Sequence, residues 1–143
     1  MTAVIIAGSR TINDMDAINA AMLRLNFKPS QIICGMADRG VDVLAVKWAE
    51  QQGIPLKPFY AHWLTKGGEK DLRAGYKRNI QMAEYAAEHD GALVALWDGW
   101  SNGTAHMIAV AEKYKLSPIS VCMLGDLAPH ESMGCLDEMR QRI

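Results

Sequence analysis

Four short segments of this sequence combine glycines, hydroxyl groups and arginines, and their types suggest anion binding. Glycine allows the backbone to approach a ligand closely, and free N–H groups at helix starts favour anions. Arg10, Arg39 and Arg78 are able to make bidentate contacts to phosphate. These residues predict a site for a phosphate-bearing small molecule. The segments are 8–11, 35–42, 73–79 and 98–104.

Simpler explanations exist for parts of these segments. The Gly-Ser pair at 8–9 also fits a plain turn, and 101–104 also fits a helix cap. Asp42 fits an N-cap better than a ribose contact. Arg78 is different, because a cation at the start of a helix opposes the helix dipole. We therefore expect Arg78 to face an anionic ligand.

Other chemistries find less support. Trp63 and Trp100 stand in polar loops, where they either stack on a base or anchor the loop. The segment 8–10 lacks the nucleophile-elbow pattern of serine hydrolases. The histidines and cysteines show no metal-ligand spacing, so no metal site is expected. They are His62, His89, His106, His130, Cys34, Cys122 and Cys135.

Composition narrows the class of protein. The chain has 143 residues and a net charge of −1, so nothing suggests a nucleic-acid partner held by bulk positive charge. The odd number of cysteines favours buried thiols in a reducing compartment over a disulfide framework. Residues 1–6 do not resemble a signal peptide, and no apolar run approaches the ~20 residues that span a bilayer. These features predict a cytoplasmic protein without a membrane partner.

Short apolar runs alternate with helical patterns along the chain. Strands are expected at 3–7, 31–34, 54–59, 92–97 and 118–123. Helices are expected at about 14–25, 43–52, 76–88 and 103–115, with Gly53 ending the second. The two prolines in 54–59 favour an edge strand, and the long loop 60–75 favours a functional or mobile segment.

This alternation predicts an α/β fold, a Rossmann-like three-layer sandwich. Its five-stranded sheet is expected to be mostly parallel, with helices on both faces, because the connections are too long for hairpins. One domain is expected over 1–125, followed by a tail over 126–143 with helical potential from 131 to 142. Ligands of such sheets bind at the carboxyl ends of the strands, where the four segments would meet.

The same segments carry a family resemblance. The four motifs are Gly-Ser-Arg-Thr at 8–11, Cys-Gly-Met-Ala-Asp-Arg-Gly-Val-Asp at 34–42, Arg-Asn at 78–79 and Trp-Asp-Gly-Trp-Ser-Asn-Gly-Thr at 97–104. Together they resemble the YspA-type branch of the SLOG superfamily. The resemblance runs in order over about 3–123. It implies a Rossmann-like fold that binds a nucleotide or a nucleotide-derived ligand, such as ADP-ribose, an NAD-related molecule or a nucleoside monophosphate.

The resemblance also implies which residues line the pocket, and the protein would act as a sensor or process its ligand. No further cofactor is expected, and a homo-oligomer is expected because the superfamily often dimerises. The ligand-binding candidates, completed by Gly40 and Asp98 from the same loops, are Gly8, Ser9, Arg10, Gly35, Arg39, Gly40, Arg78, Asn79, Asp98, Ser101, Gly103 and Thr104.

Two departures bear on activity. Met36 replaces the second glycine of the usual Gly-Gly motif, and its side chain would narrow the approach to a phosphate. Met107 stands where the related LOG phosphoribohydrolases carry a catalytic glutamate, which leaves Asp98 and Arg78 as catalytic candidates. Two alternatives remain open, namely N-glycosidic hydrolysis of nucleoside monophosphates and single-stranded DNA binding like that of DprA.

Overall fold

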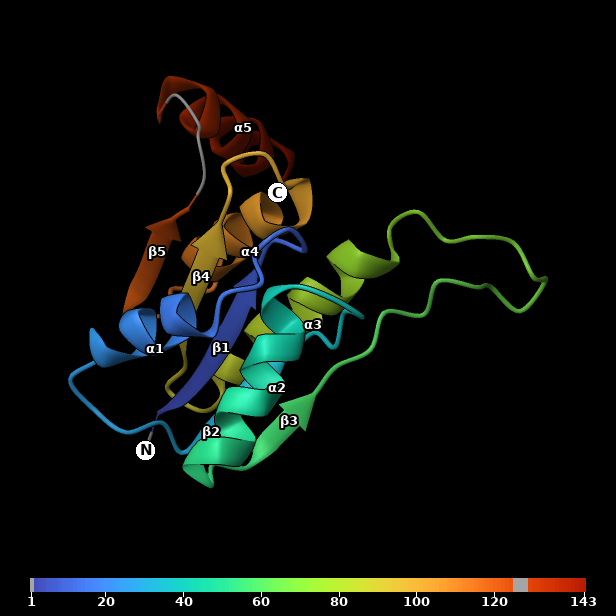
Figure 1. The fold of residues 1–143 in the computed structure, drawn as a ribbon. Coiled ribbons are helices and arrows are strands. Elements are labelled where there is room, and N and C mark those ends of the chain that lie inside the picture. Colours follow the sequence, from blue (N-terminus) through green and yellow to red (C-terminus); the bar gives the residue numbers. More distant parts are fainter. Residues whose placement is uncertain (1, 125–128) are drawn as a thin grey trace.

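The five apolar runs form one parallel sheet in the computed structural model, which describes residues 2–124 and 129–143 (Figure 1). The strand order is β3-β2-β1-β4-β5, and every neighbouring pair is parallel. The strands are β1 (Ala3–Gly8), β2 (Gln31–Cys34), β3 (Leu56–Pro58), β4 (Ala92–Trp97) and β5 (Ile119–Met123). The helices are α1 (Met15–Leu23), α2 (Val41–Gln52), α3 (Ala74–Ala87), α4 (Asn102–Lys113) and α5 (Pro129–Arg142).

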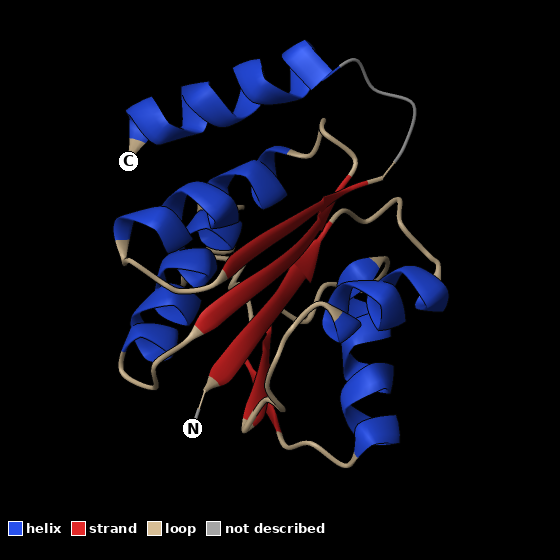
Figure 2. Cartoon of the chain, turned by 90° about the vertical axis from the view of Figure 1, so that its left-hand side faces the viewer, coloured by secondary structure: helices blue, strands red, loops and turns tan. Residues whose placement is uncertain are grey.

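Helices cover both faces of the sheet, which confirms the predicted α/β sandwich (Figure 2). Val4 and Ile6 of β1 pack toward α1 and α2, whereas Ile5 packs toward α3 and α4. Alternate side chains of a strand point to opposite faces, so a central strand of this kind must be apolar throughout. α5 lies on the outside of α4, and its Leu136 and Met139 join the apolar cluster that Ile5 forms with α3 and α4.

The carboxyl ends of β1 and β4 mark the functional edge of the sheet. From β1 the chain proceeds outward to β2 and β3, and β4 then returns to the other side of β1. The strand order therefore reverses between β1 and β4, and the loops that leave these two strands diverge to opposite faces. Such a switch point leaves a crevice in which open α/β sheets bind ligands.

Two helix starts differ from the sequence prediction. α2 begins at Val41 with Gly40 as its N-cap, so the prediction that Asp42 caps the helix is wrong. α3 begins at Ala74, after a turn in which the Asp71 side chain accepts a hydrogen bond from the Arg73 N–H. Arg78 therefore lies in the second turn of α3, and its predicted place at the helix start is also wrong.

A long arm (60–73) separates β3 from α3 and projects away from the rest of the molecule (Figure 1). Leu64 and Lys70 form an antiparallel bridge, and the Asp71 N–H donates to the Trp63 carbonyl at 2.6 Å. The arm is therefore a narrow hairpin. β3 at its base is an edge strand, as its prolines predict. None of the helices among the described residues is long and apolar enough to cross a membrane.

Candidate functional site

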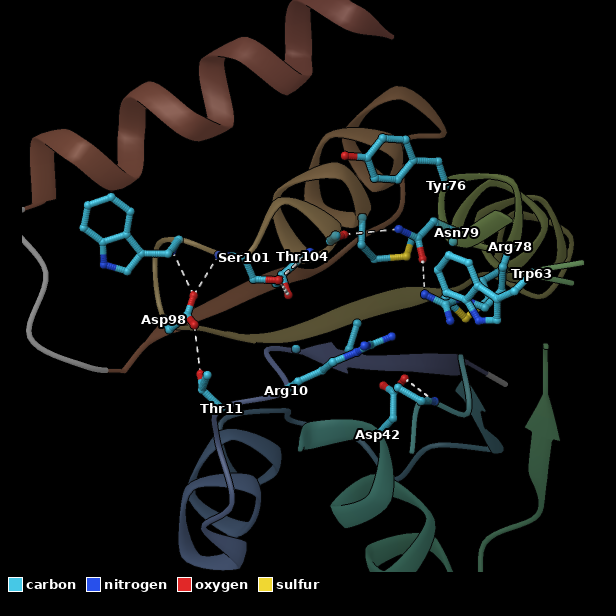
Figure 3. A pocket seen from close by; sticks show the side chains of 18 of the residues that line it. Arg10, Thr11, Asp42, Trp63, Tyr76, Arg78, Asn79, Asp98, Ser101 and Thr104 are labelled. Carbon is cyan, nitrogen blue, oxygen red and sulfur yellow. Dashed lines mark hydrogen bonds between the residues drawn. The ribbon is translucent and has the colours of Figure 1, made fainter. Parts of the chain in front are cut away.

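A cavity of about 510 Å³ lies at the carboxyl edge of the sheet (Figure 3). Its walls come from the β1–α1 loop, the start of α2, the arm, α3, and the loop and first turns that lead into α4. It is lined by Ala7, Gly8, Arg10, Thr11, Ala37, Asp42, Trp63, Leu72, Gly75, Tyr76, Arg78, Asn79, Met82, Asp98, Trp100, Ser101, Gly103, Thr104 and Met107.

Most of the residues predicted from the sequence line this cavity. They are Gly8, Arg10, Arg78, Asn79, Asp98, Ser101, Gly103 and Thr104. Ser9 lies fully buried beneath it, where its hydroxyl accepts a hydrogen bond from the Asp98 N–H at 3.0 Å. Gly35 lines a second, adjoining cavity.

Arg39 and Gly40 line neither of these cavities. The Arg39 side chain is exposed and lies 3.5 Å from the Asp38 carboxylate, so it points into solvent rather than toward Arg10 and Arg78. Gly40 lies under the β1–α1 loop, where a Cβ atom would stand 2.4 Å from the Arg10 Cα. Its contribution is to let two loops touch.

Arg78 is held at the boundary between the two cavities. Its guanidinium donates to the Gly35 carbonyl at 3.0 Å and to the Asn79 side-chain oxygen at 3.4 Å. A Cβ atom at position 35 would stand 2.9 Å from the Arg78 Nε, so a side chain there would push the guanidinium out of its present place. Burial lowers the pKa of Arg78 from its ordinary value, although the nearby Asp42 carboxylate opposes the shift.

Asp42 is a cavity residue that the sequence analysis assigned to a cap instead. The residue is 7% exposed, and its carboxylate accepts a hydrogen bond from the Ala37 N–H at 2.9 Å. Burial raises the pKa of Asp42, and the Ala37 hydrogen bond and the charges of Arg78 and Arg10 only partly offset this. Its place in an otherwise apolar stretch, 41–46, is the signal that could have indicated a buried role.

Asp98 joins the two loops that leave the switch point. One of its oxygens accepts the N–H groups of Trp100 and Ser101, and the other accepts the Thr11 hydroxyl at 2.8 Å. Burial alone would raise the pKa of Asp98, but these hydrogen bonds outweigh it, so the pKa lies below its ordinary value. Asp98 is therefore a fixed anion that orders the cavity wall.

The start of α4 forms the hydroxyl-bearing part of the wall. Ser101 is the N-cap, and its hydroxyl accepts hydrogen bonds from the N–H and the hydroxyl of Thr104. The Asn79 amide donates to the Gly103 carbonyl and to His106 Nδ1, both at 3.1 Å, and so joins α3 to α4. His106 is buried and stacks on Tyr76, and burial lowers its pKa to about 4. At neutral pH its ring is uncharged and acts as an acceptor.

Two exposed tryptophans line the cavity, one from the arm and one from the loop before α4. Trp63 from the arm is 40% exposed and lies beside Arg78 (Figure 3). Trp100 is 60% exposed, and its backbone N–H donates to the Asp98 carboxylate. Large exposed aromatic rings at the rim of a cavity leave flat apolar surface free for stacking. Sequence reasoning left the purpose of both rings open.

The described part of the chain holds no cluster of histidine, cysteine or carboxylate side chains suited to a metal ion. The Cys34 thiol is buried, and burial raises its pKa to about 12, so it is unreactive at neutral pH. Cys122 is half-buried, while His130 and Cys135 lie outside the side chains that the structure describes.

A second cavity, also of about 510 Å³, adjoins the first under the arm. Arg10, Ala37, Trp63 and Arg78 belong to the walls of both. The complete lining of the second cavity is Arg10, Gly35, Met36, Ala37, Asp38, Tyr60, Ala61, Trp63, Lys70 and Arg78. Met36 lies here with a φ of 58°, a left-handed conformation in which glycine is the usual residue. The backbone at Met36 therefore adopts a conformation that glycine would adopt more readily.

Comparison with known proteins gives one match. Residues 2–65 match the model of the YspA, cpYpsA-related SLOG family (YAcAr). This range contains the β1–α1 and β2–α2 loops and ends within the arm. Searches of curated proteins and of solved structures found no match.

Proposed function

We propose that the chain is a member of the YspA, cpYpsA-related SLOG family, whose model matches residues 2–65, and that its cavity binds a nucleotide-derived ligand. Family membership indicates nucleotide-related ligand binding or processing in general. The finer proposal is a ligand such as ADP-ribose, an NAD-related molecule or a nucleoside monophosphate, with its phosphate against Arg10 and Arg78.

The observation that carries this proposal is the pair of arginines in one cavity wall. Arg10 comes from the β1–α1 loop and Arg78 from α3, and both face the space above Asp42 (Figure 3). Arg78 is partly desolvated, so an anion placed beside it gains a charge-assisted contact that water does not fully screen.

The remaining walls suit the rest of a nucleotide. Ser101 and Thr104 place hydroxyl groups at the N-terminus of α4, where N–H groups and the helix dipole also favour anionic or hydroxyl-rich ligands. Trp63 and Trp100 offer apolar ring faces on which a base can stack. The cavity volume of about 510 Å³ lies in the usual range for sites that bury small ligands.

The proposal is binding rather than N-glycosidic cleavage. A hydrolase of that kind needs a carboxylate free to assist at the anomeric carbon. Asp98 engages both of its oxygens with the protein, and position 107 carries a methionine that lines the cavity. These features favour a protein that holds its ligand intact.

Calorimetry with a matched pair of arginine variants tests the proposal. We expect AMP or ADP-ribose to bind the wild-type protein, and Arg10→Ala to weaken binding by about tenfold or more through loss of a phosphate contact. Arg39→Ala is the control, since the sequence also predicts Arg39 as a phosphate contact but the residue lies outside both cavities. Absence of binding by the wild type, or an equal loss in both variants, would contradict the proposal.

A further inference from the structure

The two adjoining cavities differ in charge. The first has Arg10 and Arg78 opposed by the carboxylates of Asp42 and Asp98. In the second, Lys70 joins the same two arginines, and Asp38 is the carboxylate in the wall. Asp38 also lies 3.5 Å from the exposed Arg39 guanidinium. The second cavity is therefore the more cationic of the two, although no part of the proposed ligand has yet been assigned to it.

Lys70 is the residue that distinguishes the second cavity. Its backbone pairs with Leu64 across the arm, and the residue belongs to the wall of the second cavity. Among the described residues its ammonium forms no ion pair, whereas the nearby Lys77 lies 2.8 Å from the Asp71 carboxylate. An uncompensated cation at the mouth of a cavity suits an anionic group of a ligand.

The arm is tied to the body at the point where the cavities meet. The Trp63 ring contacts α3, since a Cβ atom at Gly75 would stand 3.3 Å from it. Trp63 belongs to both cavity walls, together with Arg10 and Arg78. A phosphate bound by the two arginines therefore lies at a junction from which a ligand can continue into the second cavity.

From this charge distribution we infer that the second cavity is a subsite for a second phosphate, with Lys70 as its distinguishing cation. The ligand class is then a nucleoside diphosphate, with the diphosphate either terminal or bridging to another group, in preference to a monophosphate. This inference rests on the proposed function, because it takes the first phosphate to lie between Arg10 and Arg78. Attraction to three cations makes a diphosphate bind more tightly than a monophosphate.

The test compares AMP, ADP and ADP-ribose in calorimetry on the full chain. We expect ADP to bind the wild-type protein about tenfold more tightly than AMP. Lys70→Ala should remove most of this preference while changing AMP affinity by less than about twofold, because the exposed side chain contributes only to the second subsite. Lys66→Ala, at the exposed tip of the same arm and outside both cavities, is the control and should keep the preference.

The outcomes separate the inference from the function on which it rests. Equal affinities for AMP and ADP, or an ADP preference that survives in Lys70→Ala, would overturn the second phosphate subsite and leave nucleotide binding intact. Failure of all three nucleotides to bind would overturn both. Binding of ADP-ribose at least as tight as that of ADP would identify a bridging diphosphate, and weaker binding would identify a terminal one.

Discussion

Single polar residues around the cavity divide into those that face the open space and those that hold the walls together. Arg10 ends in the cavity, whereas Asp98 and Asn79 use most of their hydrogen-bonding groups on other loops. His106 belongs to the second kind, because it accepts from Asn79 and stacks on Tyr76. A buried neutral histidine in such a network should make the fold sensitive to acid.

We expect the stability of the protein to depend on His106 below neutral pH. Its pKa is about 4 in the folded chain against an ordinary value of 6.5, so the unfolded chain takes up a proton first as pH falls. Stability is therefore lost between pH 6.5 and 4, by up to about 3 kcal/mol. His106→Asn keeps an acceptor for Asn79 but does not titrate. Urea unfolding from pH 7 to 4 should show a shallower decline for the variant, and equal slopes would contradict this account.

At the level of elements, the two glycines that stand at the ends of α2 are needed there for different physical reasons. Both have positive φ, 78° at Gly40 and 66° at Gly53. Gly53 ends the helix in the left-handed conformation with open space around it, as the sequence predicts. At Gly40 a side chain would collide with the backbone of Ser9 and Arg10, so this residue also sets the distance between α2 and the β1–α1 loop.

These glycines provide a matched pair of substitutions. Gly53→Ala should cost only about 1 kcal/mol of left-handed strain and leave ligand affinity unchanged. Gly40→Ala should cost about 3 kcal/mol or more and weaken nucleotide binding, because the β1–α1 loop must move and carries Arg10 with it. Chemical unfolding and calorimetry measure the two effects. Similar behaviour of the two variants would argue against the loop contact.

Across the whole molecule, α5 extends the core beyond the classical sheet-and-helix layers. Leu136 and Met139 are buried in the cluster that α3 and α4 share, and the Arg140 guanidinium binds both carboxylate oxygens of Glu112 on α4. A partly exposed pair of this kind contributes on the order of 1 kcal/mol, so the attachment of α5 depends mainly on its apolar contacts.

Met139 offers the clearest measure of that attachment. Met139→Ala should lower the free energy of unfolding by about 2–4 kcal/mol, because the residue is 2% exposed and its removal leaves a cavity. Glu138→Ala, the exposed neighbour on the same helix, should change it by less than about 0.5 kcal/mol. If Met139→Ala unfolds like the wild type, α5 does not share the core.

Sequence reasoning succeeded where local patterns decide structure. The unbroken apolar runs at β1 and β4 had to be central strands, and the prolines of β3 had to stand at an edge. The fold class and the family resemblance follow from such short-range features. The convergence of the loops that follow β1, β2 and β4 can be predicted as well, since parallel strands bring their carboxyl ends to one edge of the sheet.

The direction of individual side chains depended on contacts between distant segments. The packing of Arg78 on Gly35 joins positions 43 apart in the sequence, and the buried Asp42 carboxylate lies near Arg78 from the same distant helix. The outward turn of Arg39, in contrast, is set within its own loop, beside Asp38. The second cavity also depends on the tertiary structure, because its walls combine residues of the arm with the loops after β1 and β2 and with Arg78 of α3. Hydrophobic periodicity encodes elements and their order, whereas a polar side chain takes the direction in which its partners lie, and only the tertiary structure supplies those partners.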